Sequence, residues 1–408
     1  LVGIIKFLNI MKTKSYLYRY KIIYLTFIIL LSTVSIESLS AEKFSDYKKY
    51  EMIKTKFSLS EVTKGINFGW GMTFIDEHSL LITEKNGTII KVDTVSGNTT
   101  NIKHNLNPTK SGTNPFSNGQ GGLLDILFHE GFVYISYSYI SKKNLYNNTN
   151  VLYGSTAIAR GKLIGNEIKN LNNIFISNPP LKINKHWGSR IVIKNNYLYA
   201  SFGDRGHGMI AQDPTKHPGS IIRINLDGTY PPDNPKFKNY NNWLPEIYQI
   251  GFRNPQGLTI SPYDNSIYFS QHGPRGGDNF GKVVYGGNLG WKEIAWGGTE
   301  YYGLKIGDAP FKDKFDKPIL SWVPSIGIGQ IAFYKGQTFN EWNGDLICAG
   351  TKFGLLFKLK YEKNKIIKKE IIIDDKIGRI RDFEIDSKGD IYIILDEKNA
   401  SLWKLSKK

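Results

Sequence analysis

The chain has 408 residues, of which 40% are hydrophobic and 13% aromatic; this excludes an intrinsically disordered protein and allows a large core. Its net charge of +17 could suit a nucleic-acid partner, but the lysines are scattered and form no long basic block, so we expect no nucleic-acid binding. The single cysteine, Cys348, excludes an internal disulfide.

The first 41 residues are predicted to be a secretory signal peptide, with residues 1–10 as an extension upstream of Met11. Four basic residues follow Met11, then an apolar run at 22–31, then small residues up to Ala41. Ten apolar residues are too few to span a bilayer comfortably, although an uncleaved membrane anchor is the alternative. We therefore expect a periplasmic or secreted mature chain without stable membrane insertion.

One pattern recurs along the rest of the chain: a short apolar segment, a turn rich in Gly, Asp or Asn, and a β-rich segment. Its copies begin 51, 68, 67, 73 and 50 residues apart, at Gly71, Gly122, Arg190, Gly257, Gln330 and Ile380. Six units of three or four strands predict an all-β protein, a six-bladed β-propeller, formed by residues 42–408 as a single domain. A two-sheet sandwich is the alternative fold.

The chain ends and the longer spacings carry further expectations. The segment 56–64 is expected to add a strand to the last repeat, since an open ring would leave strand edges unpaired. Inserted loops are expected at 142–150, 230–242 and 301–317, where the repeats are longest.

Polar residues precede or end the second and third repeats. Gln120 lies in a Gly-Gln-Gly-Gly segment before the second, His186 precedes the third, and Asp204 ends the β segment of the third. An imidazole can accept a proton near pH 7, and a carboxylate behind it fixes its tautomer. A structural role in a loop is the alternative for a single histidine, and the nearby aspartate favours a base.

Two polar segments flank a predicted hairpin in the fourth repeat. Arg253-Asn254-Pro255-Gln256-Gly257 comes before the hairpin and 271–278, which reads QHGPRGGD, comes after it. Because the two strands are antiparallel neighbours, both segments should emerge at the same end of the sheet. Glycines there would let backbone carbonyls approach a ligand, so the pair of segments favours a site over simple turn geometry.

Cations gather in the last two repeats. Arg379 and Arg381 flank Ile380 and share one face of a strand, and Lys352 ends a strand of the fifth repeat. Such cations favour an anion, with a solvated strand end as the alternative. Trp322, before the fifth repeat, could offer an aromatic face to a planar ligand, although a core position is the usual role of a tryptophan.

Together these motifs resemble the glucose/sorbosone dehydrogenase family, the soluble quinoprotein aldose dehydrogenases, from about Phe68 to Leu405. The resemblance implies a six-bladed propeller that uses pyrroloquinoline quinone and Ca²⁺. It also implies oxidation of the anomeric carbon of an aldose to a lactone, with hydride transfer to the quinone. The electron acceptor, the sugar and the oligomeric state are not given by the sequence.

The resemblance also assigns roles to residues that match the family motifs. His186 would be the general base, Asp204 would orient it, and Gln120 would lie at the active site. The backbone carbonyls of Gly273 and Pro274 would bind Ca²⁺, since backbone oxygens suit this ion. The remaining residues would contact the cofactor, through its carbonyls, its ring or its carboxylates: Arg253, Asn254, Trp322, Lys352, Arg379 and Arg381.

The chain departs from the family pattern at several positions. Trp187 and Ser189 replace residues beside the base, and Gln271 stands where a glutamate is common. Asn279 replaces an acidic residue, which puts a second, structural calcium site in doubt. A calcium-dependent propeller lactonase and a secreted non-catalytic binding module are the alternative functions; the cation cluster argues against the first, and the pair His186 and Asp204 against the second.

Overall fold

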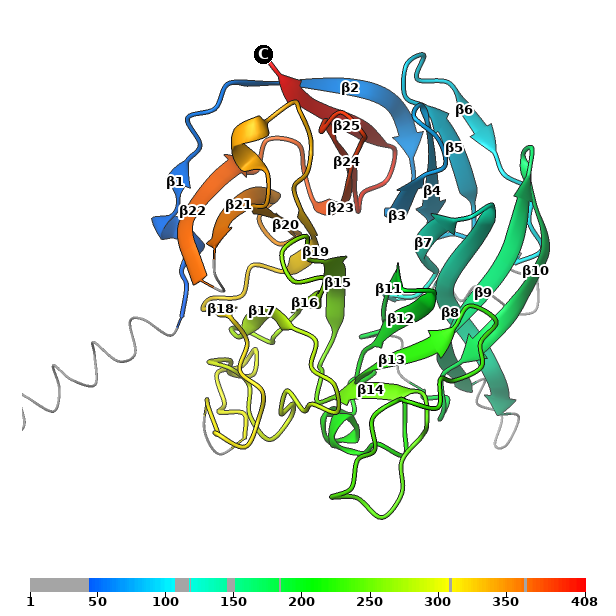
Figure 1. Ribbon diagram of the computed structural model, residues 1–408, viewed down its shortest axis with the longest axis vertical. Coiled ribbons are helices and arrows are strands. Elements are labelled where there is room, and N and C mark those ends of the chain that lie inside the picture. The colour runs from blue at the N-terminus through cyan, green and yellow to red at the C-terminus, as the bar shows by residue number, and fades with distance from the viewer. Residues whose placement is uncertain are drawn as a thin grey trace, which may run out of the picture. The chain divides into compact units, whose positions relative to one another are not determined.

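The computed structural model describes residues 44–106, 117, 119–144, 151–182, 185–307, 310–362 and 365–408. Asp46–Lys408 form one compact unit. Six β-sheets surround a common centre (Figure 1), which confirms the predicted all-β, six-bladed β-propeller. No α-helix occurs in the described ranges, which hold three short 3-10 helices: η1 (Tyr47–Lys49), η3 (Gly208–Gln212) and η4 (Asn340–Trp342).

The first three blades each consist of four antiparallel strands in chain order from the centre outward. Blade 1 holds β3 (Gly69–Phe74), β4 (Ser79–Glu84), β5 (Ile89–Asp93) and β6 (Thr99–Asn101). Blade 2 holds β7 (Leu123–His129), β8 (Phe132–Asn144), β9 (Val151–Ile164) and β10 (Glu167–Ile176). Blade 3 holds β11 (Gly188–Lys194), β12 (Tyr197–Phe202), β13 (Ser220–Asn225) and β14 (Ile247–Ile250).

Blade 4 follows the same order, whereas blades 5 and 6 each add a strand from near the start of the chain to strands from its second half. Blade 4 holds β15 (Pro255–Ile260), β16 (Ile267–Gln271), β17 (Asp278–Lys282) and β18 (Leu320–Trp322). Blade 5 holds β19 (Ile328–Phe333), β20 (Leu346–Gly350), β21 (Leu355–Glu362), β22 (Lys365–Ile373) and β1 (Glu51–Met52). Blade 6 holds β23 (Ile380–Ile385), β24 (Ile391–Leu395), β25 (Ala400–Lys407) and β2 (Phe57–Ile66).

The innermost strands are β3, β7, β11, β15, β19 and β23, and each predicted repeat begins within one of them or at the residue before it. Each innermost strand contacts the next, and β23 contacts β3, so the ring is closed. The second strands are almost fully buried, as in Leu346–Gly350, because neighbouring blades cover both of their faces. Short, continuously apolar segments therefore suit these positions.

The two chain ends close the ring. β2 pairs antiparallel with β25, from Phe57 opposite Lys407 to Ile66 opposite Ala400, which confirms the strand expected at 56–64. β1 was not expected; it pairs parallel with β22 through Glu51 and Met52. Two residues are too few to show a periodic pattern in the sequence.

The hairpin expected in the fourth repeat is formed by β15 and β16, with Leu258 opposite Phe269 and a turn whose Asn265 has φ of 53°. The expected insertions at 230–242 and 301–317 lie in the β13–β14 and β17–β18 connections. The insertion at 142–150 is partly strand, since β8 runs to Asn144, and 145–150 fall outside the described residues. The predicted signal peptide and its cleavage site also lie outside them. Within the described ranges no helix is long and apolar enough to cross a membrane.

Candidate functional site

A polar pocket opens at the end of the ring where the innermost strands of blades 2, 3, 4 and 6 begin. It holds about 590 Å³ of space between its walls, open solvent at its mouth included. Five blades contribute to its lining. The lining residues are Trp70, Lys85, Gly119, Gln120, Leu124, Trp187, Gly188, Asn254, Gln256, His272, Arg379, Arg381 and Asp396.

Four of the residues expected at a site therefore meet in one pocket, although they are far apart in the chain: Gln120, Asn254, Arg379 and Arg381. His186 and Arg253 lie directly beside it, next in the chain to the lining residues Trp187 and Asn254. The sequence did not single out Trp70, Lys85 or Asp396, because Lys85 and Asp396 lie in short charged segments typical of exposed turns and Trp70 lies in a strand-like segment.

His186 and Asp204 form a buried pair. Nδ1 of His186 lies 2.7 Å from Oδ1 of Asp204. The same carboxyl accepts hydrogen bonds from the backbone N–H of Gly206 at 2.7 Å and from the indole N–H of Trp291 at 2.6 Å. Three donors thus hold the carboxylate, and the histidine that bonds to it keeps its proton on Nδ1.

The electrostatics of this pair favour a neutral base. Burial lowers the pKa of His186; the hydrogen bond that His186 donates to Asp204 opposes this, and the charge of Arg253 lowers the pKa further, so the pKa lies below its usual value. Burial raises the pKa of Asp204, but the bonds from His186 and Gly206 lower it by more, so this carboxyl is ionised. At neutral pH the imidazole can accept a proton at Nε2.

The backbone around His186 is held in an uncommon conformation. His186 has φ of 53°, and its N–H donates to Oε1 of Gln120 at 2.8 Å. A Cβ on Gly203 would lie 2.1 Å from the carbonyl oxygen of His186, so only glycine fits opposite it. The Gly-Gln-Gly-Gly segment and the Gly-Asp segment therefore position the histidine rather than simply turning the chain.

Arg253 is fixed by the second polar segment of blade 4. Its N–H donates to Oε1 of Gln271 at 2.8 Å, and its Nη1 donates to the carbonyl of His272 at 3.3 Å. Its guanidinium lies 5.5 Å from the ring centroid of Trp291. Trp291 thus contacts both Asp204, the partner of His186, and Arg253. The local sequence gives no sign of this double contact.

The loop expected to bind calcium is built around Asp278. Its Oδ1 accepts from the N–H of Gly273 at 2.7 Å, and its Oδ2 accepts from Ile326 and Ile328 at 3.1 and 2.9 Å. A Cβ on Gly273 would lie 2.4 Å from Gly277, so the turn must be this tight. Asp278 therefore holds the Gly273–Pro274 backbone in place, with both of its carboxylate oxygens bonded to backbone N–H groups.

The two amide departures from the family pattern contact each other. Nε2 of Gln271 lies 3.3 Å from Oδ1 of Asn279, and Asn279 donates to the carbonyl of Gly277 at 2.8 Å. Two carboxylates placed this close would repel each other unless a cation or a proton lay between them, whereas the two amides form a hydrogen bond with each other directly. Among the described residues no group of three or more His, Cys, Asp and Glu could hold a metal. A cation here would need backbone carbonyls and oxygens of a ligand.

The expected cation cluster contains an acidic residue. Asp396 follows β24 and pairs through Oδ2 with Nε of Arg379 at 3.0 Å and with Nη2 of Arg381. Burial raises the pKa of Asp396, but the two guanidinium groups bring it down to about 2. Lys352 is exposed, donates to the carbonyl of Ser325 at 3.4 Å and does not line the pocket. The pocket wall is thus a partly neutralised arginine pair.

Trp322 is placed away from the pocket, which corrects the expectation of a cofactor contact. Its side chain is 0% exposed and packs in the core between blades 4 and 5. Its indole N–H donates to the hydroxyl of Tyr50 at 2.7 Å, and its ring packs edge-on against Phe357. The aromatic surface at the pocket instead comes from Trp70 and Trp187, which pack together with Leu124.

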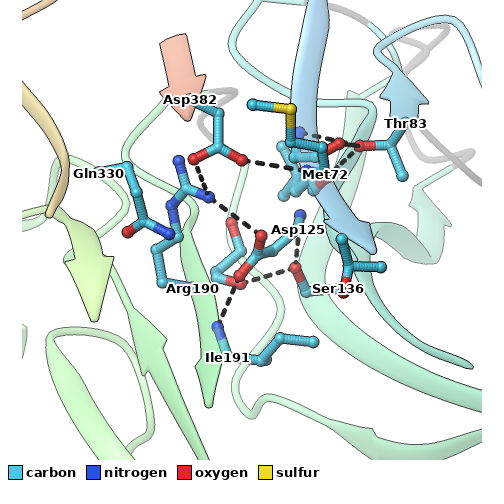
Figure 2. Close-up of polar contacts among 12 residues, drawn as sticks. Met72, Thr83, Asp125, Ser136, Arg190, Ile191, Gln330 and Asp382 are labelled. Carbon is cyan, nitrogen blue, oxygen red and sulfur yellow. Dashed lines mark hydrogen bonds and ion pairs between the residues drawn. The ribbon is translucent and has the colours of Figure 1, made fainter. Parts of the chain in front are cut away.

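A buried charged group lies beneath the pocket (Figure 2). Arg190 on β11 is 1% exposed and forms ion pairs at 3.0 Å with Asp125 on β7 and Asp382 on β23. Asp382 also accepts from the backbone N–H of Met72 on β3 at 3.0 Å. Burial raises the pKa of both carboxyls despite the arginine between them. This group ties four innermost strands together.

Comparisons with known proteins show the family of this chain. Residues 66–404 match the model of the family described as glucose / sorbosone dehydrogenase. The chain is 29% identical over 349 residues to the aldose sugar dehydrogenase YliI of Escherichia coli, covering 83% of this chain and 89% of that one. It is 30% identical over 302 residues to quinoprotein glucose dehydrogenase B of Acinetobacter calcoaceticus, covering 66% and 60%. The apo-form crystal structure of the soluble aldose sugar dehydrogenase of E. coli superposes with a TM-score of 0.78 at 26% identity, covering 86% of this chain and 100% of that one.

Proposed function

Because this chain belongs to the glucose/sorbosone dehydrogenase family, we propose that it oxidises the anomeric carbon of an aldose sugar to a lactone, with pyrroloquinoline quinone as hydride acceptor. The observation that carries the proposal is the buried pair of His186 and Asp204 beside a pocket walled by two arginines. A neutral base next to an anion-binding wall suits proton removal from a sugar hydroxyl opposite an anionic cofactor.

The residues present fit a tricarboxylate quinone. Arg379 and Arg381 together carry one more charge than Asp396 neutralises, and Nε of Arg381 is buried without a hydrogen-bond partner in the described structure. Arginine binds carboxylates through paired hydrogen bonds. Arg253 and Asn254 would meet the cofactor beside the base, and Lys352 could add a charge at the edge. Trp322 is not part of this site.

The fit to Ca²⁺ rests on backbone oxygens. The carbonyls of Gly273 and Pro274 would hold the ion, on a loop that Asp278 keeps in place, with the remaining ligands supplied by the quinone. When bound, the quinone supplies an electrophilic carbon that accepts hydride, and Ca²⁺ supplies Lewis acidity.

The chain itself handles the proton. Asp204 fixes the tautomer of His186, so that Nε2 can accept the proton of the anomeric hydroxyl. The charge of Asp204, held by Gly206 and Trp291, then stabilises the imidazolium. Arg253 lowers the pKa of His186 before the reaction and keeps the base free of a proton.

Reconstitution tests the proposal. Purified protein given the quinone and Ca²⁺ should reduce a redox dye with one or more aldoses and release the lactone. Stoichiometric quinone binding without turnover on a broad aldose panel would contradict it. Lactone hydrolysis with Ca²⁺ and no quinone would instead support the lactonase alternative. Binding of sugar without either reaction would support a binding module.

Two further parts of the proposal concern the cell rather than the site. We propose a periplasmic or secreted location, which the basic and apolar order of residues 12–41 supports. An electron acceptor must then reoxidise the cofactor in that compartment, and its identity is open. A nucleic-acid partner is not part of the proposal.

A further inference from the structure

Gln256 on β15 joins two residues of the pocket wall that belong to different blades. Its Oε1 lies 3.2 Å from Nη1 of Arg381, and its Nε2 lies 3.2 Å from Oδ1 of Asn254. The same Nε2 also lies 3.4 Å from the carbonyl of Gly188 and 3.0 Å from that of Pro255. All hydrogen-bonding atoms of this amide are therefore used, and the side chain is 7% exposed.

The orientation of this amide follows from the chemistry of its neighbours. A guanidinium can only donate, so the Gln256 atom that faces Arg381 must be the oxygen. The NH₂ group then faces Asn254, whose contacting atom must in turn be its oxygen. The backbone N–H of Gly188 reaches the same Asn254 oxygen at 3.2 Å and independently requires an acceptor there.

This order leaves one group of Asn254 for a ligand. Asn254 is 4% exposed and lines the pocket, and its Nδ2 makes no hydrogen bond to any residue that the structure describes. Nδ2 is not fully buried, so it remains accessible from the pocket. The pocket presents an N–H donor at this point and not a carbonyl.

We propose that Gln256 is a positioning residue that fixes the donor orientation of Asn254 and the place of Arg381, so that the pocket recognises a carbonyl or carboxylate oxygen at Asn254. This inference rests on the proposed function only for the identity of the ligand, the quinone. Its basis in the chain is the relay of three side chains, Arg381, Gln256 and Asn254.

The buried charged group beneath the pocket anchors this relay. Nε of Arg190 donates to the carbonyl of Gln256 at 2.8 Å, and its Nη2 lies 3.5 Å from the carbonyl of Arg381. Asp125 and Asp382 hold the guanidinium in turn (Figure 2). One fixed arginine therefore sets the separation of the two backbone segments that the Gln256 side chain bridges.

Quinone titration of the folded protein, followed by the visible absorption of the cofactor with Ca²⁺ present, tests the role of Gln256. Gln256→Met has a similar size and no charge, and it should weaken quinone binding about 3–10-fold at every pH, the effect of one or two lost hydrogen bonds. The control is Gln337→Met. Gln337 is an exposed glutamine in the loop after β19 and lies outside the pocket lining, so this variant should bind the quinone like the wild type.

Gln256→Glu separates donor orientation from mere packing. At pH 8 its carboxylate can accept from Arg381 but cannot donate to Asn254, so binding should be weakened at least as much as in Gln256→Met. Gln256→Glu keeps the shape of the wild-type side chain and its bond to Arg381, so a role in packing alone predicts wild-type quinone affinity at pH 8. Wild-type affinity of this variant would therefore overturn the inference, and the variant decides the matter if Gln256→Met does not fold.

A measurement without quinone keeps this inference separate from the proposed function. In protein labelled with ¹⁵N-asparagine, the side-chain amide signal of Asn254, assigned by its loss in Asn254→Asp, should shift in Gln256→Met and stay in place in Gln337→Met. Wild-type protein that fails to bind quinone contradicts the proposed function, and the amide signal then decides the role of Gln256. An unshifted Asn254 signal, or quinone affinity in Gln256→Met equal to the wild type, overturns the inference.

Discussion

The Nδ1 atom of His186 lies 2.7 Å from Oδ1 of Asp204 because the two residues flank one hairpin. His186 comes just before β11 and Asp204 just after β12, and the pairing of Gly188 with Phe202 brings these ends together. Local strand pairing thus brings a base and its orienting carboxylate together, and Gln120 and Trp291 from neighbouring blades then hold them in place.

His186→Gln should leave quinone and Ca²⁺ binding close to normal but lower turnover by about 10²–10⁴-fold, the usual contribution of a positioned general base. Stopped-flow reduction of the bound quinone by an aldose reports this step. His78→Gln, a change at an exposed position in blade 1, is the control and should react like the wild type. A His186 variant with wild-type kinetics would show that another group takes the proton.

The pH dependence of kcat/KM should show one acidic limb. The neutral form of His186 is active, so activity is lost as pH falls through its pKa, which burial and Arg253 place below 6.5. Asp204→Asn removes the group that raises this pKa, so the limb should move to lower pH while the maximum rate drops. If the acidic limb stays at the same pH in Asp204→Asn, the group that titrates is not His186.

Arg381→Ala should weaken quinone binding by about one to two orders of magnitude, since a charge-assisted hydrogen bond contributes about 1.5–3 kcal/mol. The sequence alone suggests that the apoprotein becomes more stable when one of several like charges is removed, because their repulsion is relieved. The pairing with Asp396 leads to the opposite expectation, a less stable apoprotein. Titration with quinone and urea unfolding of the apoprotein measure the two effects, with the exposed Lys352→Ala as a milder comparison.

Trp322→Phe should lower the free energy of unfolding by about 1–3 kcal/mol and leave quinone affinity unchanged. The change removes volume from a fully buried position and the hydrogen bond to Tyr50. Urea unfolding and quinone titration of the same variant give both values. If Trp322→Phe loses quinone affinity but keeps wild-type stability, Trp322 contacts the cofactor after all.

The exported protein should begin between about Ser40 and Lys43, where small residues follow the apolar run. N-terminal sequencing of protein recovered outside the cytoplasm measures this directly. A start at Met11 in that material would identify an uncleaved anchor instead.

The sequence by itself determined the features that depend on neighbouring residues. Strand and turn patterns placed the six innermost strands, the closing strand 57–66 and the β15–β16 hairpin, because alternation and turn chemistry are local properties. The pair His186 and Asp204 could be predicted for the same reason. The polar segments were also visible, since glycine next to His, Asp or Arg is uncommon in a plain strand.

Only the tertiary structure decided what each polar residue contacts across the blades. Trp291 of blade 4 holds Asp204 of blade 3, and Gln256 of blade 4 bonds to Arg381 of blade 6. Trp322 is buried in the core because the side of β18 that it occupies faces blade 5 and not the pocket. The two contacts between blades join residues 87 and 125 apart in the chain, and their geometry depends on how whole blades pack rather than on any local pattern.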